Sequence, residues 1–192
     1  MCNLYTQTKS VDEVARVFRE LHAPLTFPEG IPNLQPREIR ITEQMPIVRA
    51  GDTGFELVSR RWSWPAPNGK PVYNFRSEGR EFGSGRCLIL ADSFFEFTPQ
   101  ADPKAKRKHK WKFTLKGQPV FAIAGLCRKD ENVGEACTML TTEPGPDVQP
   151  YHNRQIVVLK PEDFARWLDP AVLAREVLKP LPAGSLSVEQ IC

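Results

Sequence analysis

The sequence contains no apolar run long enough to cross a membrane and no cysteine pair spaced to hold a metal ion. Its apolar stretches fall short of the roughly 18 residues that a spanning helix needs, and its first residues lack the basic and apolar regions of a signal peptide. The five cysteines are an odd number and form no CxxC or CxxH motif. We therefore predict neither a disulfide framework nor a zinc site. The expectation is a soluble cytoplasmic protein of a reducing compartment, with no membrane partner, no metal and no other cofactor.

The chain also has little net charge and no internal repeat. Its 26 basic and 23 acidic residues leave a net charge of +3, and 41% hydrophobic with 26% charged residues is typical of a globular protein. At 192 residues, without a long linker, it is expected to form one domain spanning residues 1–192. The one biased stretch, residues 104–112, holds six basic side chains and no acidic one. Such a run is either a solvated hairpin loop or a contact for nucleic acid.

Hydrophobic patterning predicts helices near the ends of the chain. Ser10 and Glu13 have the spacing of a capping box, and apolar residues at helical spacing follow, so we predict a helix from Val11 that ends before Pro24. Two further short helices are predicted at 161–168 and 170–179, the second with Asp169 as its N-cap.

The middle of the chain is predicted to be β-structure. Residues 24–46 are rich in proline and indicate an extended segment. Short runs rich in Val, Ile, Phe and Thr predict strands at 47–50, 55–62, 86–91, 94–98, 111–115, 119–126, 136–142 and 155–159. Because these strands cluster and do not alternate with helices, we predict an α+β fold with a largely antiparallel sheet.

Cys2 is the first residue that could carry chemistry. A side chain this small after the initiator methionine permits removal of Met1, which would leave a cysteine with a free α-amine. That amine has a pKa near ~7.7–8.0, so roughly a tenth of it is neutral at pH 7, far more than of a lysine with a pKa near ~10.4. It can form an imine with an aldehyde, after which the thiol can close a thiazolidine ring. Alternatively the thiol could attack an acyl carbon with the amine as base, and position alone also fits a cysteine with no role.

Five segments in order after this cysteine resemble a known family. They are residues 74–78 (NFRSE), 86–97 (RCLILADSFFEF), 121–126 (FAIAGL), 139–142 (MLTT) and 152–154 (HNR). Together with Cys2 they resemble the SRAP family, the SOS-response-associated peptidase-like proteins that process abasic sites in DNA. The resemblance runs from Cys2 to about residue 160. It implies an open barrel-like core with flanking helices, and covalent capture of the abasic-site aldehyde in single-stranded DNA as a thiazolidine.

The resemblance also implies roles for Asn74 and Glu96. Glu96 matches the catalytic glutamate of the family, and its apolar strand neighbours should raise its pKa, which suits a proton shuttle. Strand alternation alone leaves open that Glu96 faces solvent, because it lies opposite Phe95 and Phe97. Asn74 matches the active-site asparagine and offers both a donor and an acceptor. Without the resemblance, Asn74 could be a turn residue.

The remaining matches concern phosphate and base contacts. An ordinary histidine titrates near ~6.5, so His152 could act as a general acid or as a hydrogen-bond donor to a phosphate. The resemblance assigns DNA-binding roles to four residues: Arg61, Trp62, Arg76 and Arg154. Trp62 or Trp64 would offer a stacking face for a base, although both could simply be core residues. The partner expected is single-stranded DNA with an abasic site, bound by a monomer that would be nucleoid-associated in a bacterium.

The sequence departs from the family pattern at several positions and leaves rival functions open. Asn3 and Leu4 stand where the family usually has Gly-Arg, eleven residues separate Trp62 from Asn74 where the family has a longer loop, and Phe75 replaces a small residue. The rivals are an N-terminal-nucleophile cysteine amidohydrolase or peptidase and a noncatalytic nucleic-acid-binding module. Lyase and autopeptidase activities are further possibilities that the resemblance implies.

Overall fold

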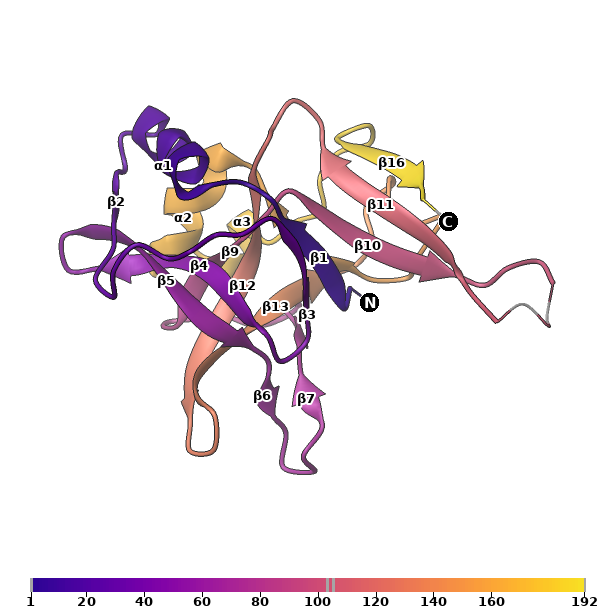
Figure 1. The fold of residues 1–192 in the computed structure, drawn as a ribbon, viewed down its shortest axis with the longest axis horizontal. Helices are drawn as coiled ribbons and strands as arrows, with labels where there is room; N and C mark the ends of the chain where they lie inside the picture. Colours follow the sequence, from indigo (N-terminus) through magenta and orange to yellow (C-terminus); the bar gives the residue numbers. More distant parts are fainter. Residues whose placement is uncertain (1, 103, 105, 192) are drawn as a thin grey trace.

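The chain forms two main sheets in which most neighbouring strands run antiparallel (Figure 1). The computed structural model describes residues 2–102, 104 and 106–191. Its five-stranded sheet has the order β16 (Leu186–Gln190), β11 (His109–Leu115), β10 (Ser93–Thr98), β1 (Leu4–Gln7) and β3 (Arg37–Arg40). The predicted fold class, with a largely antiparallel sheet and flanking helices, is confirmed.

A nine-stranded sheet packs against this first sheet. Its main order is β14 (Gln155–Ile156), β13 (Gly134–Thr142), β12 (Phe121–Asp130), β9 (Arg86–Ala91), β4 (Gln44–Gly51), β5 (Gly54–Trp62) and β2 (Leu25–Thr26). The two other members are β8 (Asn74–Arg76), which pairs in parallel with β13, and β15 (Val158–Leu159), which pairs with β12. A short ribbon of β6 (Trp64–Pro65) and β7 (Pro71–Val72) stands apart.

Alternation along β9 shows how the nine-stranded sheet is covered on both faces. Cys87 and Ile89 point into the core shared with the five-stranded sheet, while Leu88 and Leu90 point into a second core with the helices. All four are buried, and side chains that alternate between two apolar faces give the continuous apolar run typical of a buried strand.

The helices cover the second of these cores. They are α1 (Val11–Glu20), the 3₁₀ turn η1 (Pro161–Asp163), α2 (Phe164–Leu168) and α3 (Ala174–Val177). The predicted capping box of α1 is confirmed, because the Ser10 hydroxyl accepts from the Glu13 backbone N–H and the Glu13 carboxylate accepts from the Ser10 N–H. No helix in the described ranges is both long enough and apolar enough to cross a membrane.

The second C-terminal helix differs from its prediction. It spans only Ala174–Val177, and its N-cap is Leu173. Asp169 instead ends α2, where its carboxylate accepts from the Ala171 backbone N–H at 2.8 Å. Aspartate stabilises turns as readily as helix starts, so the Asp-Pro pattern marked a turn between two helices and not an N-cap.

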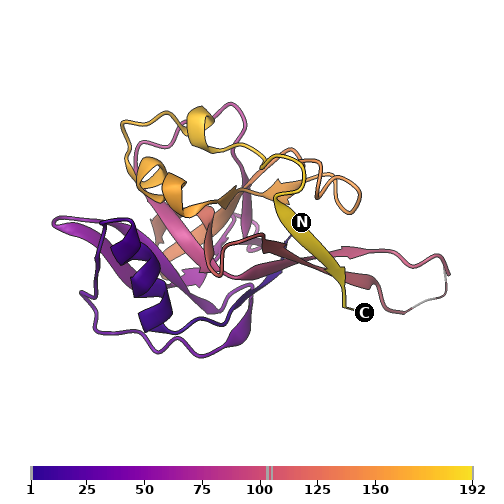
Figure 2. The ribbon, with the colours of Figure 1, turned by 90° about the horizontal axis from the view of Figure 1, so that it is seen from above.

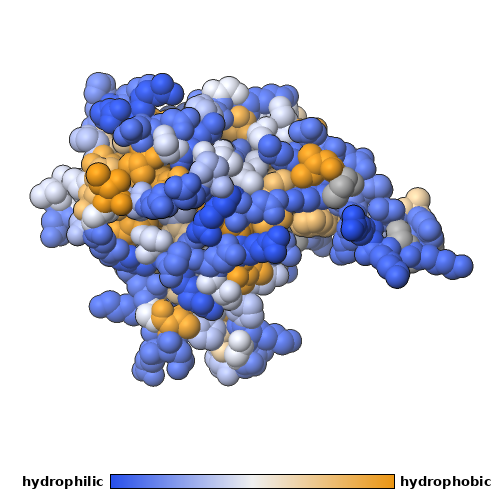
Figure 3. All heavy atoms as spheres, in the orientation of Figure 1, coloured by the Kyte–Doolittle hydropathy of each residue, from blue (hydrophilic) through white to orange (hydrophobic). Residues whose placement is uncertain are grey.

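The basic stretch lies at the tip of the β10–β11 hairpin. In Figure 2 this hairpin projects away from the end of the molecule that carries the helices. Figure 3 shows its projecting end covered by hydrophilic residues, and Lys104, Lys106, Arg107 and Lys108 are exposed. Lys110 is anchored on the hairpin by Glu38 at 2.6 Å and by the Phe95 ring, 4.0 Å away. The described part of this stretch is therefore an exposed loop followed by the anchored Lys110, and its exposure fits both a solvated loop and a contact for nucleic acid.

Candidate active site

The segment before β1 meets β8 at the junction of the two sheets. β1 pairs with β10 in the five-stranded sheet, with Tyr5 opposite Phe94. β8 belongs to the nine-stranded sheet, with Asn74 beside Met139. The Asn74 side-chain N–H donates to the Cys2 backbone carbonyl at 2.8 Å, so one hydrogen bond ties Cys2, two residues before the first sheet's β1, to the second sheet.

The Cys2 thiol is enclosed and protonated. Cys2 is 1% exposed, and its Sγ–H donates to the Leu4 carbonyl at 3.2 Å. Burial, reinforced by the nearby Glu96 carboxylate, raises the pKa of the thiol to about 12. A thiol of this kind does not act first as a thiolate nucleophile at neutral pH, so a base must take its proton during any addition.

Glu96 lies beside Cys2 and is buried. It is 1% exposed, which excludes the solvent-facing alternative for this residue. Its register partner across the hairpin is Trp111, and burial raises the pKa of its carboxyl to about 7. A carboxyl group with this pKa is present in both protonation states near neutral pH, so it can donate and accept a proton in one reaction.

Asn74 keeps one polar atom available. It begins strand β8, so it is not the turn residue that remained possible from the sequence. Its amide nitrogen binds the Cys2 carbonyl, while its buried Oδ1 has no hydrogen-bond partner in the part of the chain that the structure describes. A buried acceptor without a partner is costly unless it serves a ligand.

His152 lies in the segment between β13 and β14. Burial lowers the pKa of its imidazole below the usual range. Its Nδ1 lies 3.0 Å from both the backbone nitrogen and the carbonyl oxygen of Arg154, so it accepts from the first or donates to the second according to the tautomer. The adjacent Tyr151 packs on Trp111 with ring centroids 4.6 Å apart. Because Trp111 is the register partner of Glu96, this contact places the His152 segment on the Glu96 side of the site.

The two arginines of the site differ in their freedom. Arg154 binds Glu78 through both carboxylate oxygens and donates to the Thr141 hydroxyl at 2.9 Å. That pairing holds the pKa of the Glu78 carboxyl below its usual range. Arg76, the register neighbour of Thr141, is exposed, and its side chain has no hydrogen bond or ion pair with any described residue. The sequence analysis missed the Glu78 contact, although the acid two positions after Arg76 was the available signal.

A cavity of 460 Å³ adjoins this ion pair. Its lining includes Ser77, Glu78, Arg80, Thr142 and Arg175. Ser77 is held against β13, because its backbone N–H and its hydroxyl both donate to the Thr141 carbonyl at 3.0 and 2.9 Å. Ser77 is therefore fixed against β13, and the exposed Arg80 and Arg175 bring basic side chains beside Glu78 and Glu81 in the lining.

Arg61 and Trp62 occupy other places. Trp62 is 0% exposed, and its indole N–H donates to the Tyr73 carbonyl at 3.0 Å. Trp64 is also buried, so the structure favours packing roles for both rings over the predicted base stacking. Arg61 donates to the Thr42 carbonyl at 3.1 Å, and no described contact joins it to Cys2. Its DNA-binding role stays a prediction.

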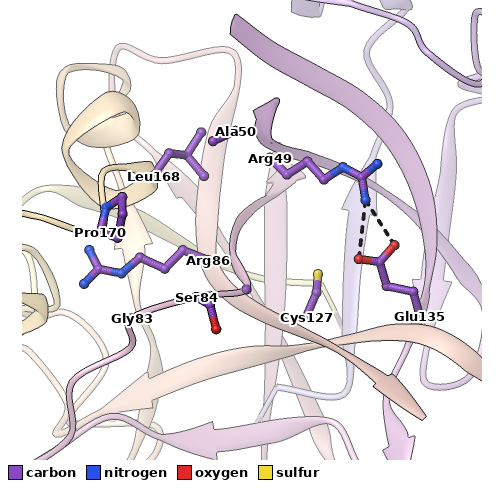
Figure 4. A pocket seen from close by; sticks show the side chains of 10 residues that line it. Arg49, Ala50, Gly83, Ser84, Arg86, Cys127, Glu135, Leu168 and Pro170 are labelled. Atoms are coloured by element: carbon purple, nitrogen blue, oxygen red, sulfur yellow. Dashed lines mark hydrogen bonds and ion pairs between the residues drawn. The ribbon is translucent and has the colours of Figure 1, made fainter. Parts of the chain in front are cut away.

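The lining of a second cavity, of 280 Å³, does not include Cys2 but contains the sulfur atom of Cys127 (Figure 4). Cys127 lines it and forms a disulfide with Cys137, so the prediction of no disulfide is wrong. The two residues are register partners on β12 and β13, a proximity that their separation of ten residues does not reveal. With Cys87, they are the described residues whose ligand atoms are close enough to hold a metal ion.

An enclosed cysteine at position 2, tied by an amide and flanked by a buried carboxyl on an antiparallel scaffold, defines a candidate N-terminal cysteine site. A family model, SOS response associated peptidase (SRAP), matches residues 1–192. The chain belongs to this family.

Curated relatives carry a shared description. The chain is 34% identical over 129 residues to the abasic site processing protein YobE of Bacillus subtilis, covering 65% of this chain and 54% of YobE. It is 34% identical over 116 residues to the abasic site processing protein YoqW of Bacillus phage SPbeta, covering 56% of this chain and 50% of YoqW. The matched part thus spans about half the length of these relatives.

Solved structures share the fold. A protein from Bordetella bronchiseptica superposes with a TM-score of 0.72 at 21% identity over 100% of both chains. A phage-related protein from the same organism has a TM-score of 0.74 at 20% identity over 99% of this chain and 94% of its own. At these identities the likeness concerns the fold alone.

Proposed function

We propose that this protein captures abasic sites in single-stranded DNA covalently through Cys2, after removal of Met1. The family membership and the names of the curated relatives support abasic-site processing. The observation that carries the finer proposal is the enclosure of Cys2 between the Asn74 amide and the Glu96 carboxyl. Met1 itself lies outside the described residues.

The protonation states favour attack by the amine before the thiol. The α-amine of a mature Cys2 would attack the C1′ aldehyde of the ring-opened sugar, and loss of water would give an imine. Glu96, with a pKa of about 7, would donate the proton that lets this water leave. The thiol, whose pKa of about 12 keeps it neutral, would then add to the imine carbon while its proton passes through Glu96 to the nitrogen. The product is a thiazolidine, and every proton is accounted for.

The other site residues would hold the nucleic acid. Arg76 is exposed and has no anionic partner in the described chain, so it suits a phosphate. His152 would act through its imidazole ring as a hydrogen-bond donor toward the sugar or a phosphate. The free Oδ1 of Asn74 can accept from a sugar hydroxyl or from the Cys2 amine.

The test is adduct formation with a synthetic abasic oligonucleotide. Purified protein should lack Met1 by intact mass and should form a band on denaturing gels that survives heating, with abasic but not with undamaged single strands. Cys2→Ala should abolish that band. Cys2→Ser can form an imine but no thiazolidine, so its adduct should appear only after borohydride trapping. Absence of a wild-type adduct, or an equal adduct with Cys2→Ala, would sink the proposal.

The same variants separate the rival functions. An amidohydrolase or peptidase would lose hydrolysis with Cys2→Ala but would never yield the aldehyde adduct. A noncatalytic binding module would keep all its DNA affinity in Cys2→Ala.

A further inference from the structure

Three cysteines from three adjacent strands converge beneath the cavity of Figure 4. Cys87 lies on β9, Cys127 on β12 and Cys137 on β13, and their sulfur atoms all lie within 4.8 Å of one another. Cys127 and Cys137 are joined as a disulfide, while Cys87 is a free thiol. None of the three takes part in the proposed reaction of Cys2.

Gly125 makes room for this convergence. It is the register partner of Cys87 between β9 and β12, two residues before Cys127 on the same face. A Cβ atom at Gly125 would lie 2.6 Å from the Cys87 sulfur, well inside van der Waals contact. The missing side chain is therefore the space through which the Cys87 thiol reaches toward the other two sulfurs.

The cluster is open on one side and has a cation next to it. Cys127 lines the 280 Å³ cavity together with Arg49, Arg86 and Glu135. Figure 4 shows its sulfur between Ser84 and the Arg49–Glu135 ion pair, in which the nitrogen–oxygen distance is 3.1 Å. Arg49 is the register partner of Cys87, and its guanidinium is already paired with Glu56 and Glu135, so these ion pairs leave little net positive charge beside the sulfurs. The cavity supplies a route for a small ion and room for one water molecule.

The spacing suits a single ion held by three sulfurs. A soft metal ion binds thiolates at about 2.3 Å, which places three sulfurs on one ion about 3.8–4.0 Å apart. Thiolate ligands select Zn²⁺ and Cu⁺ over harder ions. The present separations are at most 4.8 Å, so small side-chain rotations would bring the sulfurs to this spacing, because Cys127 and Cys137 are register partners and Cys87 lies opposite Gly125, two residues from Cys127.

We propose that, with the Cys127–Cys137 disulfide reduced, Cys87, Cys127 and Cys137 form a binding site for one soft metal ion, Zn²⁺ or Cu⁺. Reduction by a dithiol transfers two electrons and two protons to the disulfide, gives two thiols and leaves the dithiol oxidised. Binding of the ion then releases the three thiol protons to the solvent. The bound group carries a charge of −1 with Zn²⁺ or −2 with Cu⁺, next to Arg49. In the disulfide state only one free thiol is left and the site does not exist.

The experiment measures metal binding by full-length protein in its two redox states. Protein is reduced with a dithiol, desalted without oxygen and titrated with Zn²⁺ or Cu⁺ against a chromophoric chelator, and native mass spectrometry counts the ions bound. Reduced wild type should bind one ion per chain and oxidised wild type none. The Zn²⁺ and Cu⁺ titrations show which ion the site prefers.

Variants locate the site within the molecule. Cys87→Ser should abolish stoichiometric binding, whereas Cys2→Ser and Cys192→Ser should bind as wild type does. Gly125→Ala keeps all three thiols but obstructs Cys87, so its affinity should fall by about 10- to 100-fold, the scale for a disturbed metal-site surrounding. Circular dichroism confirms that each variant is folded. If Cys87→Ser does not fold, Cys127→Ser takes its place as the variant that lacks one ligand.

The opposite results would overturn the inference. They are absence of binding by reduced wild type, binding of equal affinity by Cys87→Ser, loss of binding in Cys2→Ser, or equal binding by the oxidised protein. None of these outcomes bears on DNA capture, which the abasic oligonucleotide tests separately.

Discussion

At the residue scale, burial decides the protonation states of the site residues. The Cys2 thiol, with a pKa of about 12, and the Glu96 carboxyl, with a pKa of about 7, both favour their neutral forms because little water reaches them. A proton donor and an enclosed nucleophile that needs a base therefore lie side by side. This arrangement gives the proposed capture a distinct dependence on pH.

We expect Glu96→Gln to slow both adduct formation and its reversal by about 10²–10⁴-fold, the usual scale for a general acid–base group. In wild type the rate should rise with pH up to about 7 as the α-amine loses its proton, and should fall above about pH 8, where the amine is largely neutral and Glu96 has lost its own proton. Glutamine cannot titrate, so the fall at high pH should disappear in the variant. Adduct formation, quenched at fixed times and separated on denaturing gels from pH 5 to 9, measures both the rise and the fall of the rate. Unchanged kinetics in Glu96→Gln would leave Glu96 with a packing role only.

Arg76 should contribute binding and not chemistry. Each phosphate neutralised on a single strand contributes a slope of about 0.7 in log affinity against log salt. Arg76→Ala should therefore weaken binding of undamaged single strands and flatten the slope by roughly one contact. Its reaction with a small free aldehyde should be unchanged, because no phosphate is involved. Fluorescence anisotropy at several salt concentrations measures the slope.

Lys106 and Lys108 provide the matched control for Arg76. Both are exposed at the hairpin tip, so replacing both by glutamine removes two charges at a distance from the site. We expect neither the salt slope nor the adduct yield to change. If these lysines, and not Arg76, govern the slope, the DNA runs along the hairpin and the proposed path past Asn74 is incorrect.

At the element scale, runs rich in Val, Ile, Phe and Thr predicted the long apolar strands well, whereas short strands of mixed composition were missed. Residues 86–91 were predicted exactly as β9 forms, because every side chain there is buried. β1, β8 and β16 were not predicted, since short strands with polar residues owe their conformation to the neighbours they pair with. The run at 155–159 was predicted as one strand but divides into β14 and β15, which pair with different strands.

For the candidate site too, the sequence predicted the residues better than their contacts. The position of Glu96 on an apolar strand was evident from its neighbours, but whether it faced water depended on which face the second sheet covered. The Asn74–Cys2 and Arg154–Glu78 contacts join residues 72 and 76 positions apart, and no local pattern encodes such a distance. Sequence could therefore name the residues, while their pairing required the fold.

The turn before β9 offers a test of how these strands are held together. Gly85 has a φ of +76°, and an added Cβ would overlap the Cys127 carbonyl oxygen. Gly85→Ala should lower the free energy of unfolding by more than the roughly 1–2 kcal/mol that the left-handed backbone alone costs. Gly117→Ala is the matched control, because its φ is +73° but nothing lies within 4 Å. Urea denaturation measures the free energy of unfolding of both variants. Equal losses in Gly85→Ala and Gly117→Ala would show that the overlap with the Cys127 carbonyl oxygen adds no destabilisation.

At the scale of the whole molecule, the site lies where the two sheets meet, so its electrostatics are linked to folding. Glu96 is buried only once the sheets have closed over it. In the unfolded chain its pKa is near the ordinary value of 4.5, whereas in the folded protein it is about 7. The folded state therefore holds a proton that the unfolded state has lost between these values, and its stability must fall as pH rises through that window.

This linkage predicts a difference between wild type and Glu96→Gln that depends on pH. The melting temperature of wild type relative to the variant should be highest below pH 4.5, fall as pH rises toward 7 and stay level above it. His152 titrates in an overlapping range in the opposite direction, because burial lowers its pKa and its protonation at low pH destabilises the fold. Since His152 is present in both proteins, subtracting the two melting curves removes its contribution. Thermal melts between pH 4 and 8.5 measure the difference, and a constant value across that range would mean that Glu96 ionises in the folded protein as it does in water.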